Sequence, residues 1–249
     1  MFVLQYNKNY EMVYNPKLLT PQMIVNNNIF ANTTMKTLEL FSGTGSVNKV
    51  CKKYGEVVSV DITDKLGHTP THLVDILQWD YKQYPPGYFD FIWASPPCAS
   101  FSSMLYISKS KTEIQKLMET IGLPLLNKAR EIIDYFKPKY YCIENPDSGR
   151  MKNYITDLPY KRASYCQYGF DYRKHTRFWT NIDRWSPKLC NCTGRHKTSV
   201  GGTRKNPSTK NPDNNKYITT GNSSFKLSTK YSIPQPLIID MVKSFTAII

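Results

Sequence analysis

No segment of this 249-residue chain approaches the roughly 20 consecutive apolar residues that a membrane-spanning helix needs. The first residues, 1–7, also lack the basic stretch and the apolar core of a secretory signal. These absences exclude an integral membrane protein. We expect an intracellular, non-secreted protein with no membrane partner, and the sequence leaves cytoplasm and nucleus both open.

Acidic residues are scarce. Asp and Glu number 19 against 33 Lys and Arg, which gives a net charge of +14 and a pI near 9.4. In a chain long enough for one large domain, such an excess favours a polyanionic partner, most commonly nucleic acid. The 18 tyrosines agree with this, because aromatic rings among basic residues can stack on bases.

A disulfide framework is also not indicated, because the six cysteines occur without a secretory signal. Cys51 and Cys142 lie in apolar, periodic stretches and are predicted to be core residues.

Composition divides the chain into three parts. Residues 1–35 are polar and rich in asparagine, and we interpret them as an N-terminal extension. Residues 36–183 alternate short apolar strands with helices, and an apolar helix within 231–249 is expected to return to the same domain. Residues 184–230 are basic with little apolar periodicity, which indicates a short loop-rich insertion.

The alternation of strands and helices predicts an α/β fold with a doubly wound, mostly parallel sheet. The expected strands are 37–41, 57–60, 72–74, 89–93 and 140–143, and the expected helices begin at 46 and cover 124–136 and 237–245. Ligands of such sheets bind at the carboxyl ends of the strands. Polar candidates follow these ends: the glycine turn 43–45, Asp61, Asp75, Cys98 and Glu144.

The run Ser95–Ser102 reads Ser-Pro-Pro-Cys-Ala-Ser-Phe-Ser and places a thiol directly after two prolines. Proline fixes φ and removes a backbone donor, so the pair stiffens the chain that leads into Cys98. A rigidly aimed cysteine at the end of a strand is a candidate nucleophile. The alternative is a free cysteine in a turn.

A glycine loop, Phe41–Ser46, joins the first strand to the first helix. Gly43 and Gly45 let the backbone approach a ligand, and the N-terminus of the following helix favours a carboxylate or phosphate. The third glycine of the dinucleotide fingerprint is missing. Because Asp61 ends the next strand and can accept hydrogen bonds from a ribose, the layout fits an adenosyl ligand.

Four segments together resemble the C5-cytosine DNA methyltransferases: Leu38–Gly45, Val74–Ile76, Ser95–Ser102 and Glu144–Pro146. They occur in the order of that family and lie within about residues 36–182. The Pro-Cys and Glu-Asn pairs are specific for this family when they occur together.

The resemblance implies a class I methyltransferase-like domain, made of 36–183 and 231–249, that binds S-adenosylmethionine. It implies methylation of carbon 5 of a cytosine flipped out of double-stranded DNA, with 184–230 as the target-recognition segment. A segment of about 45 residues is short for this purpose, and a short basic loop makes mostly phosphate contacts. Low sequence specificity, a very short target site and a helper subunit are all compatible with it. The oligomeric state is not predicted.

The resemblance also implies roles for individual residues. Cys98 would be the nucleophile that forms a covalent adduct, and Glu144 the acid at cytosine N3. The family's Gln-x-Arg-x-Arg segment is altered here: Arg177 matches its last arginine best, and either Arg173 or Lys174 matches the first. Pro146 follows the Glu-Asn pair, where valine is commoner. The implied cofactor contacts come from Phe41, Ser42, Gly43, Thr44, Gly45, Asp61, Ile62, Asp75, Ile76 and Pro96.

A separate group, Cys190, Cys192 and His196, offers two thiols and an imidazole within seven residues. Such ligands suit a structural zinc ion, for which Cys166 or His175 would be the fourth ligand. The Cys-x-Cys spacing is tighter than usual, and free thiols in a loop are the alternative.

Three other functions stay open. An RNA cytosine-5 methyltransferase would suit the short recognition segment. A DNA amino-methyltransferase acting on adenine N6 or cytosine N4 has a similar Ser-Pro-Pro-aromatic motif, but an exocyclic amine needs no covalent activation, so Cys98 favours carbon 5. A non-catalytic nucleic-acid binder would need neither Cys98 nor Glu144. The abundance of Asn, Lys and Tyr suggests an AT-rich coding genome, as in a low-GC microbe or a virus acting in its host cell.

Overall fold

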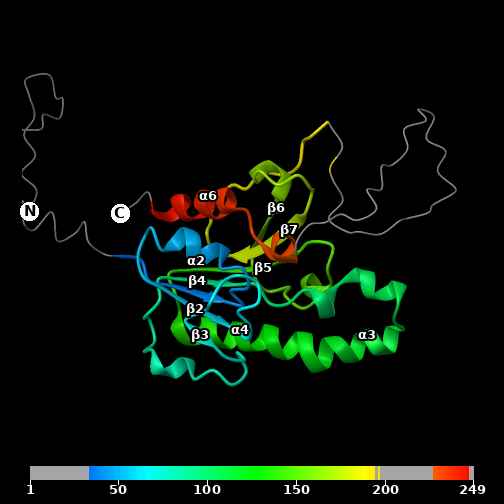
Figure 1. Ribbon diagram of the computed structural model, residues 1–249, viewed down its shortest axis with the longest axis horizontal. Coiled ribbons are helices and arrows are strands. Elements are labelled where there is room, and N and C mark those ends of the chain that lie inside the picture. The colour runs from blue at the N-terminus through cyan, green and yellow to red at the C-terminus, as the bar shows by residue number, and fades with distance from the viewer. Residues whose placement is uncertain (1–33, 194–195, 197–226, 247–249) are drawn as a thin grey trace, which may run out of the picture. The chain divides into compact units, whose positions relative to one another are not determined.

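The computed structural model describes residues 34–193, 196 and 227–246, which form a layered α/β structure (Figure 1). Most of the expected N-terminal extension and of the expected recognition segment lies outside the described residues. Among the helices that are described, none is both long and apolar enough to cross a bilayer.

A seven-stranded sheet forms the centre, with the strand order β3-β2-β1-β4-β5-β7-β6. The first five strands are parallel, and β7 runs antiparallel to both β5 and β6. The strands are β1 (Thr37–Leu40), β2 (Val57–Asp61), β3 (His72–Leu73), β4 (Phe91–Ala94), β5 (Tyr140–Pro146), β6 (Tyr160–Ser164) and β7 (His175–Thr180). The predicted doubly wound, mostly parallel sheet of a class I methyltransferase-like fold is therefore confirmed.

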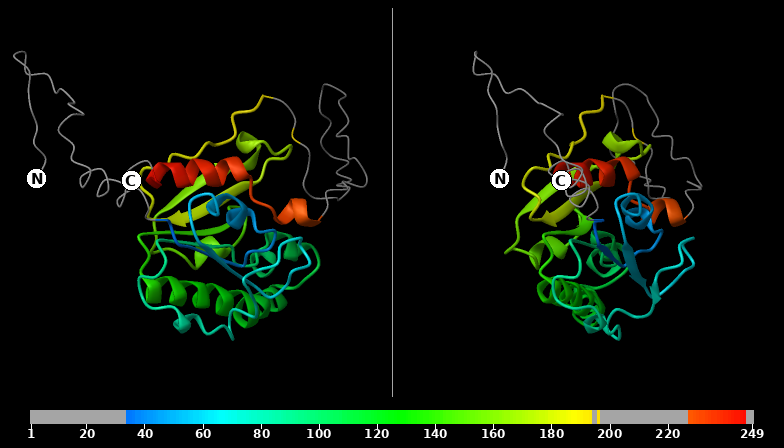
Figure 2. Two further views of the ribbon diagram at one scale, coloured as in Figure 1. Left: turned by 60° about the vertical axis from the view of Figure 1, so that its left-hand side comes forward. Right: turned by 90° about the vertical axis from the view of Figure 1, so that its left-hand side faces the viewer.

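Helices cover both faces of this sheet (Figure 2). The short helix α2 (Ser46–Cys51) and the C-terminal helix α6 (Gln235–Thr246) lie on one face. On the other face, α3 (Lys111–Leu117), the π-helical turn η5 (Met118–Gly122) and α4 (Leu123–Phe136) follow one another without a break. The remaining short elements are η2 (Tyr81–Gln83), η3 (Ala99–Phe101), η4 (Ser103–Ile107), η6 (Met151–Asn153), η7 (Tyr165–Tyr168) and α5 (Leu227–Tyr231).

Each face has its own hydrophobic core, because successive side chains of a strand point to opposite faces. In β4, Ile92 belongs to the buried cluster that includes Phe136 of α4. Its neighbour Phe91 belongs to the opposite cluster, with its ring centroid 5.2 Å from that of Phe245 in α6. A strand buried on both sides reads as a continuous apolar run, which is why β4 was visible in the sequence.

The helix predicted for 124–136 is present as α4, and the one predicted for 237–245 as α6. Pro124 lies at the start of α4, where a missing N–H costs nothing, and the residues buried on its inner face are Leu126, Ala129, Ile132 and Phe136. The antiparallel strands β6 and β7 were not predicted.

The chain after β7 runs back along β6, the strand at the edge of the sheet. The N–H of Ser164 donates to the carbonyl of Lys188 at 3.0 Å. The Lys161 ammonium donates to the carbonyls of Asp183, at 2.6 Å, and of Trp185. This path brings the start of the segment 184–230 to the carboxyl edge of the sheet.

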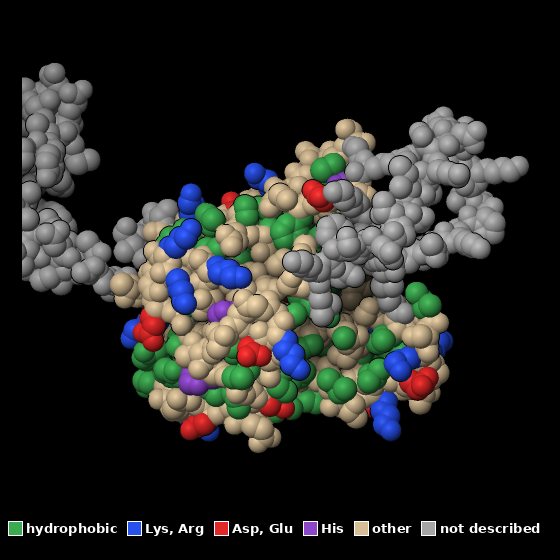
Figure 3. Space-filling view, viewed as in Figure 1, with side chains coloured by type: hydrophobic (Ala, Val, Ile, Leu, Met, Phe, Trp, Pro, Cys, Tyr) green, Lys and Arg blue, Asp and Glu red, His purple; other side chains and the backbone are tan. Residues whose placement is uncertain are grey.

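Basic side chains gather on one face of the molecule over α2 (Figure 3). Lys49, Lys52 and Lys53 are exposed there. The Lys49 ammonium also donates to the carbonyl of Thr44 at 2.7 Å, which ties this basic surface to the glycine loop.

Candidate active site

The Pro-Pro-Cys turn leaves the end of β4 and enters η3, with Cys98 as the residue before that short helix. The N–H of Ser95 donates to the carbonyl of Leu40, the last residue of β1, at 3.2 Å. On the other side, the Asn145 side-chain amide at the end of β5 donates to the carbonyl of Pro96 at 2.9 Å. Two neighbouring strands thus hold the turn that carries Cys98.

The loop after Cys98 is also held by hydrogen bonds, in this case from Arg150. The N–H of Arg150 donates to the carbonyl of Phe101 at 2.9 Å, and its guanidinium donates to the carbonyl of Ser102 at 3.1 Å. A Cβ added to Gly122 would lie 2.5 Å from Ser100 Oγ, so only glycine lets η5 approach this closely.

Glu144 is buried near the end of β5 and accepts a hydrogen bond from the Tyr165 hydroxyl at 3.2 Å. The Lys174 ammonium lies 3.8 Å from Glu144 Oε1 and 4.8 Å from the centroid of the Tyr165 ring. Burial raises the pKa of Cys98; Lys174 lowers it, and Glu144 raises it. Lys174 is therefore the charge that favours a thiolate at Cys98.

The two arginines expected at the site have other contacts. Arg177 Nε donates to Asp147 Oδ1 at 2.8 Å, and the guanidinium lies 3.9 Å from the centroid of the Tyr160 ring. Arg173 is exposed and helps to lower the pKa of Cys190, which belongs to the separate cysteine group. Of the two residues considered for the first basic position, Lys174 is the one that contacts Glu144.

A cavity of about 350 Å³ opens beside this turn, at the carboxyl ends of β1 and β2. A pocket of this volume suits a small-molecule ligand. It is lined by Phe41, Val60, Asp61, Ile62, Val74, Asp75, Ile76, Leu77, Pro97, Thr120, Ile121 and Leu125. Of the residues expected to contact the cofactor, Phe41, Asp61, Ile62, Asp75 and Ile76 line it. Pro97 takes the place expected for Pro96, whose carbonyl is bound to Asn145.

Exposed apolar side chains mark the rim of this cavity. Ile62 is 69% exposed, Leu77 40% and Ile121 49%. Because these side chains share one hollow, they offer an apolar surface to a flat ring. Asp61 and Asp75 are the two carboxylates that line the same cavity.

The glycine loop adopts backbone conformations that most residues avoid. Phe41, Gly43 and Gly45 have φ of 58°, 50° and 64°. A Cβ on Gly45 would lie 2.4 Å from His68 Cγ, so this position requires glycine. Strain at a non-glycine residue such as Phe41 persists where the surroundings over-determine the conformation, often at a binding site.

The remaining loop residues differ in their surroundings. The N–H of Gly43 donates to Asp61 Oδ2 at 2.7 Å, which couples the loop to the end of β2. Ser42 Oγ is buried without a hydrogen-bond partner among the described residues. Thr44 lines a second hollow of about 400 Å³, beside α2 and α5.

Sequence reasoning missed Glu39, in the middle of β1. Its carboxylate accepts the N–H groups of Val47, at 3.1 Å, and of Asn48, at 2.9 Å, in the first turn of α2. The helix N-terminus expected to face a ligand is therefore occupied by the protein's own carboxyl group. Burial raises the pKa of Glu39 to about 8 even though both amides lower it. The signal available in the sequence was an acidic residue between two leucines of an apolar strand.

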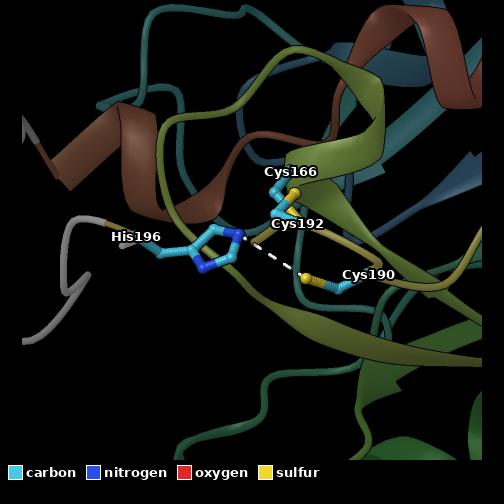
Figure 4. A group of neighbouring side chains, drawn as sticks. All are labelled: Cys166, Cys190, Cys192 and His196. Carbon is cyan, nitrogen blue, oxygen red and sulfur yellow. Dashed lines mark hydrogen bonds between the residues drawn. The ribbon is translucent and has the colours of Figure 1, made fainter. Parts of the chain in front are cut away.

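The expected metal ligands come together. Atoms of Cys166, Cys190, Cys192 and His196 that can bind a metal ion all lie within 4.8 Å of one another (Figure 4). His175, the other candidate for the fourth position, instead has its Nδ1 2.8 Å from Ser164 Oγ.

The strand order and the cavity at the ends of β1 and β2 define an α/β protein of the doubly wound class with a ligand-sized cavity at the carboxyl ends of its strands. The family model described as C-5 cytosine-specific DNA methylase matches residues 35–153. A probable DNA (cytosine-5)-methyltransferase of Frog virus 3 (isolate Goorha) is 39% identical over 220 residues, which cover 84% of this chain and 99% of that protein. The chain belongs to the C-5 cytosine-specific DNA methylase family and is a DNA cytosine-5 methyltransferase.

Solved structures give more distant matches. The methyltransferase EhMeth of Entamoeba histolytica is 14% identical with a TM-score of 0.42, over 67% of this chain and 58% of that one. A DNMT2 mutant of Spodoptera frugiperda is 21% identical with a TM-score of 0.38, over 63% of this chain and 53% of that one. The matched part thus spans little more than half of either solved chain.

Proposed function

We propose that the chain transfers a methyl group from S-adenosylmethionine to carbon 5 of a flipped cytosine in double-stranded DNA through a covalent adduct on Cys98. The observation that carries this proposal is the environment of the Cys98 thiol. It directly follows Pro97, which lines the cavity, and it interacts electrostatically with both Glu144 and Lys174.

The cavity suits the cofactor in its chemistry. Ile62 and Phe41 offer apolar contact to an adenine, Asp61 can accept ribose hydroxyls, and Asp75 can accept the adenine amino group. The Ser42 hydroxyl, in the adjoining glycine loop, has no hydrogen-bond partner among the described residues. When bound there, S-adenosylmethionine supplies an electrophilic methyl group.

Cysteine chemistry is needed because carbon 5 of cytosine is not nucleophilic. The Cys98 thiolate forms a bond to carbon 6, and the displaced electron pair makes the ring enamine-like, so that carbon 5 can accept the methyl group. Glu144 provides the proton at N3 and limits the charge that develops on the ring. S-adenosylhomocysteine is the leaving group of the methyl transfer. Loss of the proton from carbon 5 to a base, with return of the N3 proton to Glu144, then expels the thiolate and restores the aromatic ring.

We assign Lys174, rather than Arg173, to the first basic position of the family's altered segment. Its ammonium lies beside Glu144 and lowers the pKa of Cys98, so it favours the reactive thiolate. Burial raises the pKa of the same thiol, which makes the lysine more important to reactivity than it would be for an exposed cysteine.

The target atoms lie inside the duplex stack, so the base must be flipped out to meet Cys98. The loop after the nucleophile provides side chains for this task. Tyr106 is 55% exposed, with the Arg150 guanidinium 4.7 Å from its ring centroid, and Lys109 and Lys111 are exposed nearby. This combination of an aromatic ring and cations suits contact with a displaced base and its phosphates.

The decisive experiment is trapping on DNA that carries 5-fluorocytosine, in the presence of labelled S-adenosylmethionine. Fluorine cannot leave as a proton does, so we expect a stable protein–DNA adduct with wild type and with Cys51→Ala, a control that removes a buried thiol. Cys98→Ser should give none. Label on adenine N6, or full activity in Cys98→Ser, would overturn the assignment, and trapping on RNA alone would replace DNA by RNA as substrate.

A further inference from the structure

The cysteine group beside the β6–β7 hairpin draws its members from three places in the chain. Cys166 lies in η7, which connects β6 to β7, Cys190 and Cys192 lie in the segment after β7, and His196 lies beyond them (Figure 4). All three cysteines are free thiols. Cys166 is distant in the sequence from the other three residues, so the fold itself brings it to them.

The spacing of these side chains fits tetrahedral zinc. With typical zinc–sulfur and zinc–nitrogen bonds, a thiolate sulfur and an imidazole nitrogen on one ion lie about 3.6 Å apart, and two sulfurs about 3.8 Å apart. Cys190 Sγ lies 3.5 Å from His196 Nε2, and all potential ligand atoms of the group lie within 4.8 Å of one another. Little movement is required to close them around one ion.

Neighbouring polar groups already orient these ligands. The Gln167 side-chain amide donates to Cys192 Sγ at 3.1 Å. The N–H of Cys190 donates to Ser164 Oγ at 2.9 Å, and that hydroxyl in turn lies 2.8 Å from His175 Nδ1. Such outer contacts fix the direction of metal ligands and raise affinity.

We propose that Cys166, Cys190, Cys192 and His196 bind one structural zinc ion. Three thiolates and an imidazole are soft ligands of the kind that zinc favours, whereas magnesium and calcium require oxygen. Four protein ligands leave no open position for water, so the site is structural rather than catalytic.

The ion would join the start of the segment 184–230 to the active site. Cys166 directly follows Tyr165, whose hydroxyl donates to Glu144 and whose N–H donates to the carbonyl of Lys174 at 3.1 Å. Zinc at Cys166 therefore anchors a turn that contacts both Glu144 and Lys174. The importance of this link for catalysis rests on the proposed function, whereas the metal site itself does not.

Metal analysis of the full chain, purified under reducing conditions in the presence of zinc and then desalted, tests the proposal. We expect about one zinc per chain in wild type and its loss in the Cys190→Ala, Cys192→Ala double variant. Cys51→Ala and Cys98→Ser should both keep the metal. Because Cys98→Ser is expected to be inactive yet zinc-loaded, failure of the metal site and failure of the proposed chemistry are distinguishable.

A second measurement covers the case in which the double variant does not fold. Wild type freed of metal by a chelator should bind cobalt with the intense visible bands of a tetrahedral site and thiolate charge-transfer absorption. Weak octahedral bands, a wild type that takes up no zinc when fully reduced, or a folded double variant that keeps its zinc would each overturn the proposal.

Discussion

The Lys174 ammonium lies 3.8 Å from Glu144 Oε1, and the same ammonium lowers the pKa of Cys98. One positive charge therefore lies beside the Glu144 carboxyl group and also favours the thiolate of Cys98. Lys174 immediately precedes β7, whose first residues lie at the carboxyl edge of the sheet because the strand is antiparallel to β5.

Removing this charge should slow methyl transfer in a pH-dependent way. In Lys174→Ala, the pKa of Cys98 rises further, so the rate should reach its plateau at a higher pH than in wild type. Below the thiol pKa, each unit of upward shift lowers the thiolate fraction, and hence the rate, about tenfold. Single-turnover rates measured across pH check this expectation.

Two variants sharpen the Lys174 test. Lys174→Arg keeps the charge and should retain most of the wild-type pH profile, while Arg173→Ala removes an exposed neighbouring charge and should leave the profile unchanged. An unshifted profile in Lys174→Ala would show that the lysine does not act on Cys98.

Ile62→Ser should weaken cofactor binding without loss of stability. Ile62 is 69% exposed although it lines the cavity, so its replacement leaves the core intact. Loss of apolar contact with an adenine should raise the dissociation constant for S-adenosylmethionine about tenfold. Calorimetry without DNA measures this. Ile107→Ser is the matched control, since Ile107 is 78% exposed and does not line the cavity; equal affinities in the two variants would contradict the assignment of the cavity.

Glu39 should make the protein less stable as pH rises. Its pKa is raised from 4.5 to about 8 in the folded state, so between these values the folded state holds a proton that the unfolded state has lost. Stability from this group is present in full below about pH 4.5 and declines toward pH 8, by up to about 1.4 kcal/mol per pH unit.

Urea unfolding of wild type and Glu39→Gln across this range measures the contribution of Glu39. The difference in unfolding free energy between the two proteins should change with pH, whereas Glu119→Gln, at an exposed position, should run parallel to wild type. A constant offset between Glu39→Gln and wild type would mean that Glu39 stays ionised in the fold.

The parallel half of the sheet was predictable because its strands are buried on both faces and end at glycine, acidic or cysteine residues. β1, β2 and β4 were found close to their predicted bounds for this reason, and α4 because its buried apolar residues recur at helical spacing. β6 and β7 were not predicted because their sequences are mixed in polarity and because the pairing of β7 with β5 and β6 is a long-range property.

The residues of the candidate site likewise divide into those that could be predicted from the sequence and those that could not. Cys98, Glu144, Asp61 and Asp75 follow strand ends or lie near them, so their convergence could be foreseen. The choice of Lys174 over Arg173 could not, because it depends on how the chain enters a strand that the sequence did not reveal. The hydrogen bonds between Glu39 and the first turn of α2 could not be foreseen either, because they depend on how β1 and α2 cross in three dimensions.

The return of the chain along β6 has a further consequence, for solubility. An edge strand with free backbone groups is a template on which another chain can add a strand. Here the residues from Asp183 to Lys188 take up the Ser164 N–H and the Lys161 side chain, so that part of the edge is already occupied. The same stretch that carries Cys190 toward Cys166 thus covers part of this edge, and we expect mutations that detach it to promote aggregation before they unfold the core.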